Sequence, residues 1–207
     1  MEFHDSEVTG AAKNRVPSGG AVITVTYMDV TFTKDSGRRY LVTVVRERGP
    51  ELAPRHGPGY DDYLPHDAVH FLVEAEARLA GAAFGRIAAG QSNLFWPADN
   101  RLMRHQKRKE AKRKPSPIEH AQMGRSEDLA AVCQVLWQLR TRHRSEPPLW
   151  FLDRVPSEDL ESRLTERILA RLDEFAARWH PLPPGGSITL TWPLDDHGRR
   201  PRVAAEP

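Results

Sequence analysis

The sequence predicts an α+β fold, with a small antiparallel sheet made from an N-terminal hairpin and a C-terminal strand and packed with about four to five helices. Three observations predict it. Residues that favour strands cluster near both ends of the chain, and helical periodicity fills the middle. The middle also offers no strands that could alternate with helices, which argues against a parallel sheet.

The length of 207 residues suits a single domain that can bury a core without disulfides or metals. We place this domain at 21–194. The flanking segments 1–20 and 195–207 are rich in Gly, Pro, Ala and charged residues and show no apolar period. Such segments cannot bury enough apolar surface to fold, so we expect two disordered tails.

The N-terminal hairpin is predicted from two runs of β-branched and aromatic residues, 22–33 and 39–46. The Asp and Gly of 34–37 between them are typical of a tight turn. Apolar residues change parity in the first run near Tyr27, which predicts either a β-bulge there or a strand covered on both faces.

The third strand is expected at 187–192, where apolar residues alternate with Thr after the breaker Pro-Pro-Gly-Gly at 183–186. We expect it to pair with the N-terminal hairpin.

The first helices are expected after a loop at 49–59 that is rich in Gly and Pro. One begins near His66 and is ended or bent at Gly81, and a short apolar segment at 82–89 is closed by Gly90.

The later helices are predicted from N-cap signals. Ser126, followed by Glu and Asp, precedes one apolar periodic stretch, and Ser157, followed by the same two acids, precedes another. Pro115 and Pro117 are predicted to stop the basic segment that comes before them.

The cysteine count and the absence of long apolar runs limit the class of protein. Cys133 is the sole cysteine, which excludes an internal disulfide and any metal site that needs two or more thiolate ligands. No run approaches the 18 or so apolar residues of a membrane span, and the N-terminus lacks the pattern of a signal peptide. We therefore expect a cytoplasmic protein that is not inserted into a membrane.

The helix near His66 carries the clearest candidate site. At about 100° per residue, His70 lies about 40°, Glu74 about 80° and Asp67 about 100° from His66, so the four side chains share one face. Imidazoles four residues apart can bind one ion, and zinc or iron chemistry needs a third ligand such as a carboxylate. We expect one divalent metal (zinc, iron or manganese) bound by His66, His70 and Glu74.

The chemistry expected of such a site is metal-assisted hydrolysis, with Asp67 and Glu74 as catalytic acids or bases and with support from Asp61 and Asp62. The same residues also fit the solvated face of an amphipathic helix or buried, hydrogen-bonded histidines. The sequence leaves these alternatives open and names no substrate.

Two resemblances rest on this region. The pattern His66-Asp67-x-x-His70 resembles the His-Asp-x-x-His motif of a zinc-associated family in ubiquinone biosynthesis, whose glutamate follows the second histidine by twelve residues. That position is Ala82 here, so we carry over no activity. The phrases at 59–67 and 84–90 resemble uncharacterised proteins of high-GC actinobacteria, a resemblance that implies no activity.

The segment 101–114 supports a rival hypothesis, a non-enzymatic binding module, because it contains eight Lys or Arg residues and one acid in a chain of formal charge +2. Such density can follow a phosphate backbone or meet an acidic protein, although a solvated basic helix or linker would look the same. The expected contact residues are Arg104, Lys107, Arg108, Lys109, Lys112, Arg113 and Lys114.

Overall fold

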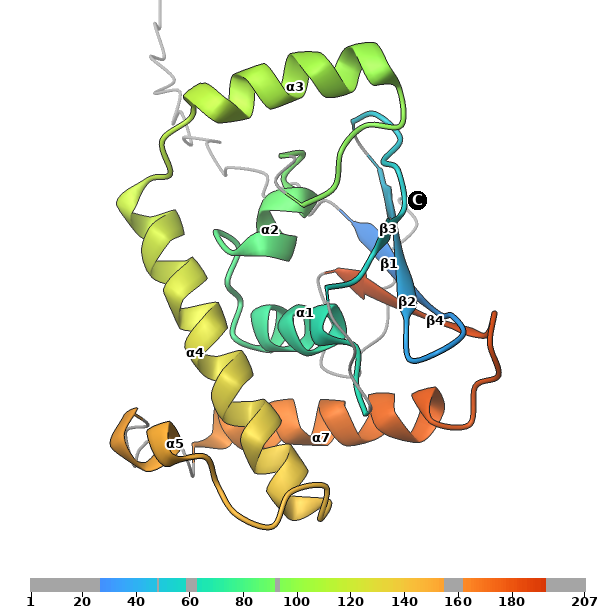
Figure 1. Cartoon of the computed structure of the whole chain (residues 1–207). Coiled ribbons are helices and arrows are strands. Elements are labelled where there is room, and N and C mark those ends of the chain that lie inside the picture. Colours follow the sequence, from blue (N-terminus) through green and yellow to red (C-terminus); the bar gives the residue numbers. More distant parts are fainter. Residues whose placement is uncertain (1–26, 48, 59–62, 92–93, 155–161, 193–207) are drawn as a thin grey trace, which may run out of the picture.

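The computed structural model confirms the α+β class (Figure 1) and describes residues 27–47, 49–58, 63–91, 94–154 and 162–192. The predicted tails at 1–20 and 195–207 lie outside the described residues.

The sheet has four antiparallel strands in the order β3-β2-β1-β4. The strands are β1 Met28–Lys34, β2 Tyr40–Arg46, β3 Arg55–His56 and β4 Ser187–Trp192. Strand β4 has the predicted bounds and pairs with β1 from Met28↔Trp192 to Thr33↔Ser187, which confirms that the C-terminal strand joins the hairpin. The two-residue strand β3 was not predicted, and it lies within the expected loop at 49–59.

One face of the sheet is buried and the other is open. Alternate residues of the three long strands are buried under the helices that cover this face in Figure 1. On the open face, the hydroxyls of Thr31 and Thr189 lie 2.8 Å apart across neighbouring strands. The β1–β2 register runs without interruption from Met28↔Arg46 to Lys34↔Tyr40, so the described part of the strand contains no bulge. The apolar residues before Tyr27, where the predicted change of parity begins, lie outside the described residues.

Six helices occur within the described residues. They are α1 His66–Glu76, α2 Ala83–Ala88, α3 Asn100–Lys112, α4 Pro117–Arg140, α5 Leu149–Arg154 and α7 Arg163–Trp179.

The predicted start of α4 at Ser126 is wrong, because the helix begins nine residues earlier at Pro117. Proline suits the first position of a helix, where its missing N–H would have no partner in any case. Ser116 and Glu119 form a reciprocal capping box there, with Ser116 Oγ accepting from Glu119 N and Glu119 Oε2 accepting from Ser116 N. Ser126 is therefore a buried residue inside α4.

The last helix, α7, begins at Arg163 with Ser162 as its N-cap, whose hydroxyl accepts from Thr165 N at 3.1 Å. The predicted cap at Ser157 lies outside the described residues. Helix α5 was not predicted.

Helix α1 occupies the centre of the fold, between the sheet and helices α4 and α7 (Figure 1). Phe71 of α1 makes edge-to-face contacts with Phe32 of β1, Phe84 of α2 and Trp192 of β4, with ring centroids 6.5, 5.2 and 5.9 Å apart. Such pairs add to the free energy of burying the rings. Within the described residues, no helix is both long and apolar enough to cross a membrane.

Two glycines in helices provide a matched test of this packing. A Cβ at Gly85 in α2 would lie 2.5 Å from backbone atoms of Ala80, whereas a Cβ at Gly124 in α4 would meet nothing within 4 Å. We expect Gly85→Ala to lower the free energy of unfolding by about 2 kcal/mol or more, because backbone must move. Gly124→Ala is expected to raise it by up to about 1 kcal/mol through helix propensity. Urea denaturation measures both, and a neutral Gly85→Ala would contradict the packing of α2.

Candidate functional site

The polar face of α1 exists as predicted, but most of it points into the protein. His66 is exposed, whereas Asp67, His70 and Glu74 are 4%, 8% and 0% exposed. A buried ionisable group must find partners, because desolvation of a charge is costly. The partners of these three residues define what the face can do.

Asp67 joins the start of α1 to the sheet. Its Oδ1 accepts from Arg55 Nη2 at 2.5 Å and its Oδ2 accepts from the Tyr40 hydroxyl at 3.0 Å. Burial, together with the nearby Asp67 carboxylate, raises the pKa of Tyr40, so the phenol stays protonated and keeps donating. Both carboxylate oxygens are thus engaged, which gives Asp67 a structural role, while its predicted catalytic role stays untested.

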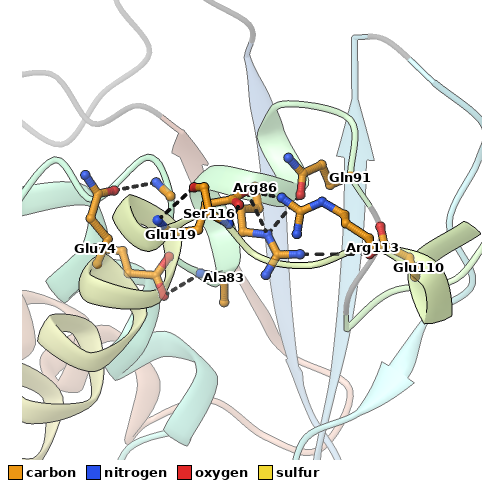
Figure 2. A network of polar contacts seen from close by, with 10 residues as sticks. Glu74, Ala83, Arg86, Gln91, Glu110, Arg113, Ser116 and Glu119 are labelled. Atoms are coloured by element: carbon orange, nitrogen blue, oxygen red, sulfur yellow. Dashed lines mark hydrogen bonds and ion pairs between the residues drawn. The ribbon is translucent and has the colours of Figure 1, made fainter.

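Glu74 acts as a cap for a different helix. Its Oε2 accepts from Phe84 N at 2.7 Å and its Oε1 accepts from Ala83 N at 3.2 Å (Figure 2) and from the Ser126 hydroxyl at 3.0 Å. These amides form the N-terminus of α2, where the N-cap residue Ala82 has no polar side chain to offer. Burial raises the pKa of Glu74 to about 7, although the hydrogen bonds from the backbone and Ser126 oppose this rise.

Arg46 holds the opposite end of α2. Its Nη1 donates to the carbonyl oxygens of Ile87 and Gln91 at 3.2 and 3.3 Å, and its Nη2 donates to Pro50 O at 3.2 Å. A carboxylate at the N-terminus of α2 and a guanidinium at its C-terminus both complement the helix dipole. The six-residue helix is therefore held in place by side chains from α1 and β2.

His70 is connected to Glu74 through Ser126. The Ser126 hydroxyl donates to Glu74, so its oxygen accepts from His70 Nδ1, which lies 3.2 Å away. This arrangement assigns the proton to Nδ1 and leaves a lone pair on Nε2. Glu74, Ser126 and His70 thus form one chain of hydrogen bonds between α1 and α4.

The outer side of His70 opens on a small surface pocket of about 110 Å³. The His66 and His70 ring centroids are 4.5 Å apart, and Glu127 Oε2 of α4 lies 3.7 Å from His70 Nε2. Burial and the neighbouring His66 lower the pKa of His70, which favours the neutral imidazole. The remaining lining residues are Val69, Ala130, Ala131 and Gln134.

Glu127, rather than the predicted Glu74, is therefore the carboxylate that faces the histidine pair. Among the residues that the structure describes, no group of three or more His, Cys, Asp or Glu side chains is placed to hold a metal ion. Asp61 and Asp62 lie outside the described residues. Glu127 could not be selected from the sequence, because its proximity depends on how α4 crosses α1.

The basic segment forms α3, which the structure describes in full and which contains no buried residue. Asp99 caps its start by accepting from the backbone N–H groups of Arg101 and Leu102 at 2.9 and 2.7 Å. Lys107 Nζ lies 5.3 Å from the centre of the Trp96 ring. Arg113 comes directly after the helix.

A network of ion pairs fixes the other end of α3 (Figure 2). Arg86 of α2 lies 4.0 Å from Glu110 of α3 and 3.8 Å from Glu119 of α4, and Arg113 pairs with Glu119. The hydrogen bond from Ser116 N and the contact with Arg113 hold the pKa of Glu119 well below its usual range. Of the predicted contact residues, Arg113 is therefore committed within the protein, and the other six are exposed.

Sequence reasoning missed a larger cavity of about 370 Å³ beside the β1–β2 turn. It is lined by Lys34, Arg38, Arg39, Tyr40, Tyr63, Pro65, His143, Trp179 and His180. The pair Arg38-Arg39 directly after Gly37 was the available signal, but the aromatic residues come from distant segments.

Comparison with protein-family models, curated proteins and solved structures finds no match for this chain.

The environment of Glu74 predicts a stability that depends on pH. Its pKa of about 7 in the folded protein exceeds the ordinary value of 4.5, so the folded state binds the proton more tightly, and this contribution to stability is lost as pH rises from about 4.5 to 7. The lowered pKa of His70 acts in the opposite direction. The quantity to measure is therefore the difference in the free energy of unfolding between wild type and Glu74→Gln. In urea denaturation this difference should change by up to about 3 kcal/mol between pH 5 and 8.

Glu146→Gln is the control, because its side chain is exposed, and it should leave the dependence of stability on pH nearly unchanged. If the difference in the free energy of unfolding between wild type and Glu74→Gln stays constant across this pH range, the buried, capping role of Glu74 is contradicted.

Proposed function

We propose that the protein is a non-enzymatic binding module in which α3 contacts the phosphate backbone of nucleic acid. The observation that carries this proposal is that α3 buries none of its residues, all of which are described, and yet is capped by Asp99 at its start and paired with Arg86 of α2 near its end. A helix of 13 residues is marginal in water by itself. Because α3 adds nothing to the core, a role on the surface explains it best.

The charge distribution supports an anionic partner. Eight basic residues and one acid give the segment 101–114 a formal charge of +7, and since the whole chain carries +2, the remainder carries −5. Glu110, the acid in this segment, lies on the side of α3 that faces Arg86. A concentrated positive field on an otherwise acidic protein steers anions to one place.

The basic side chains form a stripe on the outer side of α3. At about 100° per residue, Arg101, Arg104, Arg108 and Lys112 fall within an arc of about 80° and extend over about 16 Å. The half-buried residues of the helix, Met103, Gln106 and Glu110, lie on the opposite arc. The stripe therefore points away from the protein.

The chemistry of α3 favours nucleic acid over an acidic protein. Interfaces between proteins generally have an apolar core, but Leu102 is the one large apolar side chain of α3 with substantial exposure in the described structure. Phosphate contacts need no such core. Phe95 is buried and Trp96 lies beside Lys107, so neither ring is presented for base stacking. We therefore propose binding that follows the backbone, without preference for sequence.

The buried carboxylates of α1 favour a binding module over a hydrolase. The carboxylates of Asp67 and Glu74 each have hydrogen-bond donors on both oxygens and lie beneath the surface. An acid or base catalyst must reach its substrate.

A divalent metal at His66 and His70 is the second candidate, because the proposed tautomer leaves the Nε2 lone pair of His70 in a pocket shared with His66 and Glu127. The hydrogen bond from the other ring nitrogen to Ser126 is what metal-binding histidines usually make. Rotation of the exposed Glu127 side chain would complete a set of two histidines and one carboxylate.

The nucleic-acid proposal predicts a steep salt dependence. Affinity for a 20-base-pair DNA, measured by fluorescence anisotropy, should fall with a slope of about −4 in log K against log salt if the four residues of the stripe each meet a phosphate. The variant with Arg101, Arg104, Arg108 and Lys112 changed to Gln should lose most of this affinity and slope.

A matched control changes four exposed arginines elsewhere to Gln, which removes the same charge. These are Arg78, Arg142, Arg163 and Arg178. Equal loss in both variants would mean that net charge alone acts, and binding of polyglutamate as tight as that of DNA would favour an acidic protein partner. Either result would overturn the proposal.

The metal candidate predicts that protein purified without a histidine tag binds about one equivalent of Zn²⁺ in calorimetry. His66→Ala or His70→Ala should weaken binding by tenfold or more, since each removes a ligand, and Glu127→Gln should weaken it less. His105→Ala on α3 is the control. Unchanged binding in the His66→Ala, His70→Ala double variant would remove this candidate.

A further inference from the structure

The cavity beside the β1–β2 turn is separate from both α3 and the histidine pair. Its volume of about 370 Å³ lies within the range of about 300 to 1,000 Å³ of small-molecule sites. We propose that it binds a small phosphate ester with a planar ring, of the size and chemistry of a nucleoside monophosphate. This inference goes beyond the proposed function and does not rest on it.

The charge of the lining selects an anion. Lys34, Arg38 and Arg39 line the cavity, and no acidic side chain belongs to the lining among the described residues. Lys34 Nζ donates to the carbonyl oxygens of Trp179 and His180 at 3.2 and 3.1 Å, and so neutralises the negative end of α7 at this point. The two guanidinium groups of the turn then provide the planar donor geometry that suits phosphate.

The backbone of the turn has an unusual conformation at Arg38. Gly37 and Arg38 both have left-handed backbone angles, with φ of 65° and 68°. Gly or Asn is favoured at such positions, because a larger side chain meets steric cost there. An arginine kept in this conformation at the mouth of a cavity is an example of local strain coinciding with a binding group.

Aromatic rings form another part of the wall. The rings of Tyr63 and His143 are stacked with centroids 3.9 Å apart and an angle of 19° between their planes. His180 Nε2 lies 2.9 Å from the carbonyl oxygen of Tyr63, which ties this platform to the end of α7. Stacking on such rings suits a planar base and does not require a particular base. The combination of guanidinium groups and rings is what distinguishes a nucleotide from inorganic phosphate.

The experiment measures binding of adenosine 5′-monophosphate, adenosine and inorganic phosphate to the full chain by calorimetry at constant ionic strength. The monophosphate should bind at least tenfold more tightly than either of the other two. The double variant with Arg38→Ala and Arg39→Ala should bind the monophosphate at least tenfold more weakly, because both phosphate donors are lost. His143→Ala should weaken binding of the monophosphate but leave binding of inorganic phosphate unchanged, because His143 is exposed and supplies only its ring.

The control is Arg104→Ala, Arg108→Ala on α3, which Figure 1 places toward the opposite end of the molecule from the β1–β2 turn. This control should keep wild-type affinity for the monophosphate, even if it loses DNA binding, so the two proposals fail independently. Circular dichroism confirms that each variant is folded. Absence of monophosphate binding, equal affinity for phosphate alone, or wild-type affinity in the Arg38, Arg39 variant would overturn the proposal.

Discussion

The carboxylate of Glu74 accepts hydrogen bonds from the N-terminus of α2 and from Ser126 of α4, and so connects three helices that are separate in the sequence. Much of the remaining arrangement depends on this contact. Helix α2 carries Arg86, whose ion pairs with Glu110 and Glu119 orient α3 and the start of α4. A buried carboxylate without these donors would be strongly destabilising, so the position of α2 is closely constrained.

This arrangement separates two kinds of polar group. Those of α1 are used inside the protein, where Asp67 joins the helix to the sheet and Glu74 joins it to α2 and α4. The basic groups of α3 contribute nothing to the core and face the solvent. Asp67 and Glu74, which the sequence suggested as catalytic residues, thus have hydrogen-bond partners inside the protein, whereas the basic side chains of α3 are exposed.

Sequence patterns predicted the elements whose signals are local. Strand β4 was placed correctly because alternation is clear and a Pro-Gly breaker precedes it, and helical spacing placed His66, Asp67, His70 and Glu74 on one face of α1. The pattern could not reveal which residues of that face are covered, since α2 and α4 cover them. Ser126 was mistaken for an N-cap because Ser followed by acids suits a helix start, whereas its partners are 52 and 56 residues away. Pro117 was interpreted as a stop, although proline equally suits the first turn of α4.

The most direct test of this account is a titration of the Glu74 side-chain carboxyl by ¹³C nuclear magnetic resonance, with the Ala83 and Phe84 amides followed in the same samples. The account predicts a midpoint near pH 7 for Glu74, with both amide signals shifting over the same range, because the amides donate to that carboxylate. A midpoint near the ordinary value of 4.5, with amides that do not respond, would show that Glu74 is solvated and that α2 is held in another way.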